Sequence, residues 1–129
     1  FTKLEQRHID LSGCILKTNM VSSGKDSSTP ATPEAIGMAT AAILRHALPR
    51  YLTGVLFLSG GQPAKAATEN FTAICQNAPY PWPISFAFGR ALQDPAMTLW
   101  KGKSDNLRSA QAALKKYLDA NTDAMRYLR

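Results

Sequence analysis

A lysine lies in the middle of a strand-like segment near the start of this 129-residue sequence. Along the segment Ser12–Met20, the two-residue period of a strand places Gly13, Ile15, Lys17 and Asn19 on one face. Burial of a lysine favours its neutral amine, and a neutral amine can attack a carbonyl and form a Schiff base. The same pattern also fits a lysine that extends from a strand end into solvent, so the segment alone leaves both interpretations open.

Two other segments have the residues for binding a phosphate. Ser59-Gly60-Gly61 lies where a second strand-like run is followed by a helix, and paired glycines there let a phosphate approach backbone N–H groups. A plain tight turn would have the same sequence. Gly89-Arg90 follows a third strand-like run, and Arg90 suits either a phosphate or an ion pair with a surface carboxylate.

The sequence does not favour a metal or another cofactor. His8 and His46 are the only histidines, and no Cys/His cluster with metal-ligand spacing is present. The nucleophile elbow of a Ser–His–Asp hydrolase is missing, and the Ser22–Pro30 segment has no P-loop pattern. We therefore expect chemistry carried by side chains alone.

The elements that must position these residues alternate between strand and helix. Short apolar runs predict strands at Ser12–Met20, Thr53–Leu58 and Pro83–Phe88. Thr32 is a suitable N-cap for a first helix that Pro49 would end. Helices are expected over Pro33–Leu48, Pro63–Asn77, Ala91–Trp100 and Ser104–Leu128.

The 3.6-residue period of the apolar side chains predicts which face of each helix is buried. The expected buried positions are Ile36, Ala39, Ile43 and Ala47 in the first helix, and Ala67, Phe71, Ile74 and Cys75 in the second. In the last helix, with Ser104 as N-cap, they are Leu107, Ala110, Leu114, Leu118 and Met125.

This alternation is typical of an α/β protein with parallel strands and right-handed crossovers, either an open doubly wound sheet or a closed barrel. Three strands cannot close a barrel, and a parallel sheet is normally covered on both faces. We therefore expect the 129 residues to be part of a larger structure. The lysine, the paired glycines and Gly89-Arg90 would then lie at or near the C-terminal ends of successive strands, where α/β proteins bind ligands. A phosphorylated carbonyl compound fits all three features.

The composition fits a globular protein with an anionic partner. The formal net charge is +6, and 45% of the residues are hydrophobic. The basic residues are dispersed without interleaved aromatics, which favours a solvated surface over nucleic-acid binding.

No apolar run is long enough to span a membrane. Cys14 and Cys75 have no paired spacing, which is typical of reduced thiols in the cytoplasm.

Four blocks of the sequence resemble class I, Schiff-base-forming fructose-bisphosphate aldolases. They are Ile15–Val21, Phe57–Gln62, Phe88–Gln93, and the stretch with Trp100, Gly102-Lys103 and Asn106. Their order and spacing match the family over nearly the whole chain. The resemblance implies a (β/α)₈ TIM barrel of ~250 residues, of which this chain would cover about the sixth to eighth strands and the C-terminal helix. The 129 residues would then be the C-terminal part of a single barrel domain.

The resemblance also implies an activity: reversible cleavage of fructose 1,6-bisphosphate into dihydroxyacetone phosphate and glyceraldehyde 3-phosphate, without a cofactor. It further implies a cytoplasmic homo-oligomer whose acid/base carboxylates come from earlier strands, so these residues alone should be inactive. By resemblance, Lys17 forms the imine, and the substrate phosphate is bound by Ser59, Gly60, Gly61, Gly89 and Arg90.

Four positions depart from the residues usual in the family. Ala87 stands where Ser is usual, Phe88 where Tyr is common, Ser12 in place of Glu, and Thr18 in place of a frequent Pro. These positions bear on affinity and substrate preference rather than on imine chemistry. Two alternatives stay open: a related Schiff-base aldolase for another phosphorylated ketose, and a non-catalytic, aldolase-like assembly protein with acidic partners.

Overall fold

A three-stranded parallel sheet forms the centre of the computed structural model, which describes residues 1–24 and 26–129. The strands β1 (Ile15–Thr18), β2 (Gly54–Phe57) and β3 (Ile84–Phe86) lie in the order β1-β2-β3. Both pairs are parallel, as the alternation of strands and helices predicted. The α/β class is therefore confirmed.

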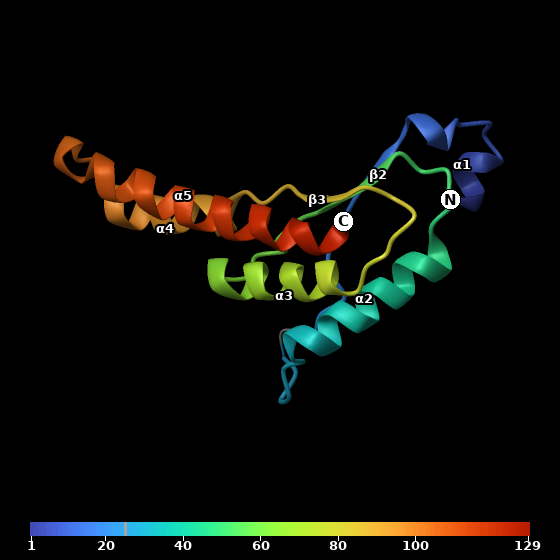
Figure 1. The fold of residues 1–129 in the computed structure, drawn as a ribbon, viewed down its shortest axis with the longest axis horizontal. Coiled ribbons are helices and arrows are strands. Elements are labelled where there is room, and N and C mark those ends of the chain that lie inside the picture. Colours follow the sequence, from blue (N-terminus) through green and yellow to red (C-terminus); the bar gives the residue numbers. More distant parts are fainter. Residues whose placement is uncertain (25) are drawn as a thin grey trace.

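The helices connect and follow these strands. Figure 1 shows α2 and α3 together on one side of the strands, and α4 and α5 side by side in an arm that extends away from the sheet. The helices are α1 (Thr2–Glu5), α2 (Pro33–Ala47), α3 (Ala64–Gln76), α4 (Arg90–Trp100) and α5 (Leu107–Ala124). Three short 3₁₀ turns lie at Leu11–Gly13, Ser104–Asn106 and Met125–Leu128.

The first strand is shorter than the sequence predicted. It begins at Ile15 instead of Ser12, because the preceding residues form a 3₁₀ turn. The Ser12 backbone N–H donates to the Asp10 carboxylate at 2.9 Å, and the Ser12 hydroxyl donates to the same oxygen at 2.7 Å. This local hydrogen bonding competes with strand formation at Ser12.

The predicted single helix from Ser104 is wrong at both ends. Ser104 begins a 3₁₀ turn, α5 begins at Leu107 after Asn106, and Met125 begins a second 3₁₀ turn. The predicted buried face is also only partly buried, since Leu107 and Leu118 are exposed. The main packing partners of α5 are α4 and α3, so only the side of α5 that faces these two helices is covered.

The core lies between the sheet and the two helices α2 and α3. The ring of Phe71, on α3, packs edge-on against Phe57, Phe86 and Phe88, with ring centroids 6.2, 5.6 and 5.9 Å away. The predicted buried face of this helix is confirmed at Ala67, Phe71, Ile74 and Cys75.

Both cysteines are free thiols, as the sequence predicted. Cys14 is half-buried, and Cys75 is completely buried on α3. Burial raises the pKa of the Cys75 thiol to about 12. That thiol therefore stays protonated at neutral pH and acts as a small apolar side chain.

The buried face of α2 differs from the predicted one. Ile36 is buried as expected, but Ala39, Ile43 and Ala47 are exposed. Gly37 faces the backbone of Ala73 on α3, and the residues three, four and seven positions later share that buried face. The buried residues of α2 are Ile36, Gly37, Thr40, Ala41 and Leu44.

Gly37 sits where α2 and α3 approach most closely, so we expect Gly37→Ala to destabilise the protein. A Cβ at Gly37 would lie 2.7 Å from both the carbonyl carbon and the carbonyl oxygen of Ala73. Backbone atoms cannot move aside as a side chain can, so overpacking should cost about 1–3 kcal/mol despite the better helix propensity of alanine. Urea unfolding measures this loss. Gly13→Ala is the matched control, since a Cβ at Gly13 meets nothing within 4 Å. Equal stability of the two variants would contradict the close crossing.

Candidate active site

The segments that follow the three strands start at one level of the sheet. Thr18 of β1 pairs with Phe57 of β2, which pairs in turn with Phe86 of β3. Because the strands are parallel, the loops after them meet at the same edge. Lys17 lies near the end of β1, and the predicted phosphate-binding residues lie in the segments that follow β2 and β3.

The paired glycines form a tight turn at this edge. The Gln62 backbone N–H donates to the Ser59 carbonyl at 3.0 Å, which closes the turn Ser59–Gln62. Gly60 and Gly61 have φ values of +59° and +80°, the positive values that a type I′ turn requires at both central positions and that glycine adopts without strain. Ser59 is buried, while both glycines are exposed just before the N-terminus of α3. The turn can therefore offer its glycine N–H groups to an anion.

Arg90 lies over this turn. Gly89 is the N-cap of α4 and Arg90 its first residue, and both are exposed. A Cβ at Gly61 would lie 3.6 Å from Nη2 of Arg90, so the guanidinium approaches the glycine turn to within van der Waals distance. Within the described ranges, no carboxylate forms an ion pair with Arg90. Of the two interpretations of Arg90, the geometry favours an anion ligand over a surface ion pair.

Asn19 connects the lysine strand to the same turn, although the sequence pattern did not mark it as a site residue. A Cβ at Gly60 would lie 2.6 Å from Oδ1 of Asn19. Asn19 follows Lys17 by two residues, so the two side chains share a face and are separated by about 6–7 Å along the chain. The two-residue period of the strand places Asn19 on the same face as Lys17, and this pattern could have identified Asn19 as a site residue.

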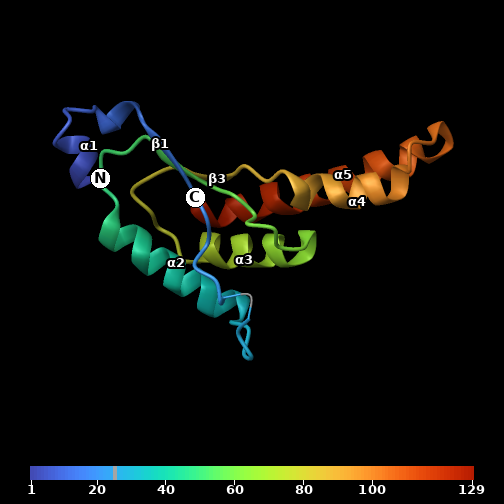
Figure 2. The same ribbon diagram turned by 180° about the vertical axis from the view of Figure 1, so that it is seen from behind.

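Lys17 is exposed, which contradicts the expectation of burial. The predicted faces of β1 are right: Leu16 and its partner Val55 join the core under the helices, while Lys17 pairs with Leu56 on the opposite face. Within the described residues β1 pairs with β2 alone, which leaves it at an edge. Figure 2 shows the blue trace of β1 leading toward the loop before α2. Because Lys17 points to the face of the sheet opposite the core, its amine reaches water.

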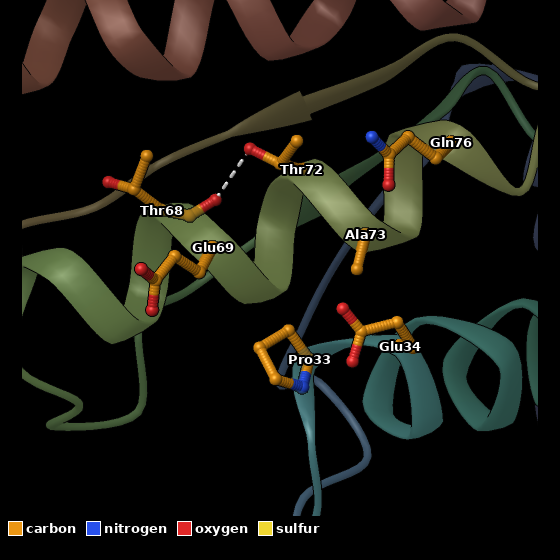
Figure 3. A pocket seen from close by; sticks show the side chains of 7 residues that line it. All are labelled: Pro33, Glu34, Thr68, Glu69, Thr72, Ala73 and Gln76. Atoms are coloured by element: carbon orange, nitrogen blue, oxygen red, sulfur yellow. Dashed lines mark hydrogen bonds between the residues drawn. The ribbon is translucent and has the colours of Figure 1, made fainter.

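A separate hollow of about 420 Å³ lies between the first turn of α2 and α3. Figure 3 shows Glu34 at the start of α2 and Glu69 on α3 at its rim. Hydrogen bonds from its own backbone N–H and from the Thr32 hydroxyl lower the pKa of Glu34, so this carboxylate stays ionised. Two carboxylates repel a phosphate, and none of the predicted site residues lines this hollow.

Two other properties of the described residues bear on the kind of site. No three His, Cys, Asp or Glu side chains within residues 1–24 and 26–129 are grouped so that they could hold a metal ion. In the same part of the chain, no helix combines the length and the apolar character needed to cross a membrane.

Known proteins are similar to this chain in sequence and in fold. The family model for fructose-bisphosphate aldolase class-I matches residues 1–127. The fructose-bisphosphate aldolase of Drosophila melanogaster is 44% identical over 126 residues, covering 96% of this chain and 34% of the relative. That of Dictyostelium discoideum is 46% identical over 118 residues, covering 92% of this chain and 32% of the relative.

A solved structure agrees with these relatives. The fructose-bisphosphate aldolase from Plasmodium falciparum, crystallised in complex with TRAP and a small molecule inhibitor, superposes with a TM-score of 0.93 at 36% identity. The match covers 98% of this chain and 37% of that one. The chain thus spans 34% of the length of the Drosophila relative and a similar share of the solved aldolase. With this sequence match, and with its lysine strand, glycine turn and arginine at one sheet edge, the chain belongs to the class I fructose-bisphosphate aldolase family.

Proposed function

We propose that the full-length protein containing these 129 residues cleaves fructose 1,6-bisphosphate reversibly into dihydroxyacetone phosphate and glyceraldehyde 3-phosphate, through an imine at Lys17. The observation that carries the proposal is the convergence at the sheet edge. Arg90 lies over Gly61, and Asn19, two residues after Lys17, lies against Gly60. An amine and an anion-binding turn so arranged suit a ketose that carries a phosphate near its carbonyl.

The chemistry assigned to Lys17 is covalent catalysis. The neutral amine attacks the ketose carbonyl, and loss of water gives an iminium. When the carbon–carbon bond breaks, its electron pair moves into the iminium and forms an enamine, so the positive nitrogen is the electron sink. Protonation of the enamine and hydrolysis of the imine then release the second triose phosphate and regenerate the lysine. The carboxylates that move these protons lie on strands outside the present sequence.

The glycine turn and Arg90 have a binding role in this proposal. The N–H groups of Gly60 and Gly61 donate to the phosphate oxygens, and the first turn of α3 adds the positive end of a helix dipole. Arg90 supplies a charge-assisted hydrogen bond. Holding the phosphate fixes the carbonyl carbon relative to Lys17, and this orientation lowers the entropic cost of attack.

The proposal also includes a larger barrel to which this sheet belongs. The 129 residues form the C-terminal part of one (β/α)₈ barrel domain, which is supported by the 34% share of the Drosophila relative and by the edge position of β1. In that barrel Lys17 faces the interior, where neighbouring strands exclude water. A cytoplasmic location and a homo-oligomeric state, with no nucleic-acid or membrane partner, complete the proposal. The two free thiols support the location.

Arg90→Ala should weaken the use of the bisphosphate in the full-length enzyme. A charge-assisted hydrogen bond contributes about 1.5–3 kcal/mol, so kcat/KM should fall about ten- to a hundred-fold. Steady-state cleavage of fructose 1,6-bisphosphate measures this, with Arg108→Ala, an exposed arginine on α5, as the control. If the kinetic constants of Arg90→Ala are unchanged, Arg90 is a surface residue that does not bind the phosphate.

A comparison of two substrates tests the proposed function itself. The full-length enzyme should cleave fructose 1,6-bisphosphate with a higher kcat/KM than fructose 1-phosphate. A preference for another phosphorylated ketose would indicate a related Schiff-base aldolase. Cleavage of neither substrate by a folded protein would contradict the proposal and favour a non-catalytic member of the family.

A further inference from the structure

A buried amide supports the glycine turn from behind. Asn70 lies on α3 and is only 7% exposed. Its Nδ2 donates to Oε1 of Gln62 at 2.6 Å. Gln62 is the last residue of the turn Ser59–Gln62, and its backbone N–H closes that turn. The side chain of Asn70 is thus joined to the backbone of the turn through a single residue.

Besides the hydrogen bond that closes it and the neighbouring side chains of Asn19 and Arg90, the turn depends on the residues at its ends. Gly60 and Gly61 have no side chains, and glycine adopts positive and negative φ with similar ease. The conformation of the turn must therefore be fixed at its two ends. Ser59 at one end is buried directly after β2, and Gln62 at the other end is held by Asn70. Without the second anchor, the glycine N–H groups would sample several directions.

Gln62 also connects the turn to the strand that carries the lysine. Its Nε2 lies 3.6 Å from Sδ of Met20, which is 3% exposed in the core. Met20 follows Asn19, whose side chain lies against Gly60. The amide of Gln62 therefore contacts α3 on one side and the end of the lysine strand on the other.

We propose that Asn70 is a positioning residue: through Gln62, it keeps the Ser59–Gln62 turn in the conformation that presents its glycine N–H groups to a phosphate. This inference rests on the proposed function, in which that turn binds the substrate phosphate. Asn70 does not touch the substrate. Its sequence position supports the role, because Ala67, Phe71 and Ile74 on the same buried face of α3 are apolar. A polar side chain at such a position is costly unless it has a specific partner.

The test uses the full-length enzyme with inorganic phosphate as a competitive inhibitor. Asn70→Leu keeps a side chain of similar branching and removes the donor. Both the inhibition constant of phosphate and KM for fructose 1,6-bisphosphate should rise about two- to twelvefold, the equivalent of one lost neutral hydrogen bond. The turnover number should stay within about threefold, because the lost interaction acts on binding alone.

A second variant tests the same contact from the other side. Gln62→Met, at a half-buried position, removes the acceptor while keeping a side chain of similar length. It should raise both constants as Asn70→Leu does. The double variant should be no worse than either single variant, since both remove the same hydrogen bond. Gln62→Met alone decides the question if Asn70→Leu does not fold.

Asn77→Leu is the matched control. Asn77 caps the far end of α3, and its Nδ2 donates to the Ala73 carbonyl at 2.8 Å. This variant should lower stability without changing phosphate inhibition. If Asn70→Leu and Gln62→Met behave like Asn77→Leu, in an enzyme where Arg90→Ala does weaken phosphate binding, Asn70 is a structural residue and the inference is overturned. If Arg90→Ala has no effect either, the proposed phosphate site is wrong, and the inference falls with it.

Discussion

Replacement of Lys17 by methionine should lower cleavage of fructose 1,6-bisphosphate by the full-length enzyme by on the order of 10⁴- to 10⁶-fold, as loss of a covalent nucleophile does in other enzymes. Methionine has a similar length and an apolar character, so the strand should form as before. It has no amine, and therefore no iminium can accept the electrons of the broken carbon–carbon bond. Substrate binding should persist, because the phosphate-binding turn and Arg90 are unchanged.

The control for this variant is another lysine of the same chain. Lys65 on α3 is exposed and forms a surface ion pair with Glu69 at 3.7 Å. Surface pairs of this kind contribute little, so Lys65→Met should keep full activity. Steady-state rates for both variants, with phosphate inhibition as a check on binding, measure the difference. Activity of Lys17→Met within tenfold of the unchanged enzyme would mean that another residue carries the chemistry.

The second large effect concerns the 129 residues expressed alone, which should show no measurable cleavage. The face of β1 that carries Lys17 reaches water in this chain. In the proposed barrel, side chains from other strands would surround this face and exclude water from the site. The unpaired side of β1 also exposes backbone N–H and C=O groups, which promote association between chains.

Circular dichroism in the near ultraviolet, light scattering and a cleavage assay on the isolated chain test this expectation together. We expect weak tertiary signals, association and no activity. As a control, the remaining part of the proposed barrel is added as a separate chain, which would supply the acid/base carboxylates. A monomeric product that melts cooperatively and cleaves the bisphosphate would show that the 129 residues are a complete small enzyme.

Much of the site could be predicted from the sequence because its residues lie in short, local patterns. The strand period placed Lys17 and Asn19 on one face, and glycine pairs mark turns with positive φ. The parallel alternation of strands and helices then placed the lysine segment, the glycine turn and Arg90 at one edge, as the sheet register confirms. These features depend on a few neighbouring residues each.

The other features of the fold and of the candidate site depend on contacts between elements, which no local sequence pattern encodes. On α2, Gly37 faces the backbone of α3, so Thr40, Ala41 and Leu44 share the buried face and Ile43 is exposed. The amide of Asn70 finds Gln62 only when α3 packs behind the turn. Lys17 is exposed because it points to the face of the sheet opposite the core, and which face is covered is a property of the assembled sheet and not of the strand sequence.

The most direct test of the imine at Lys17 is borohydride reduction of the full-length enzyme in the presence of dihydroxyacetone phosphate, followed by peptide mass spectrometry. Reduction converts a transient imine into a stable secondary amine, so the adduct records which nitrogen was attacked. We expect one triose phosphate per chain, located on the peptide that contains Lys17, and no adduct in Lys17→Met. An adduct on a different lysine, or equal trapping by Lys17→Met, would show that Lys17 is not the nucleophile.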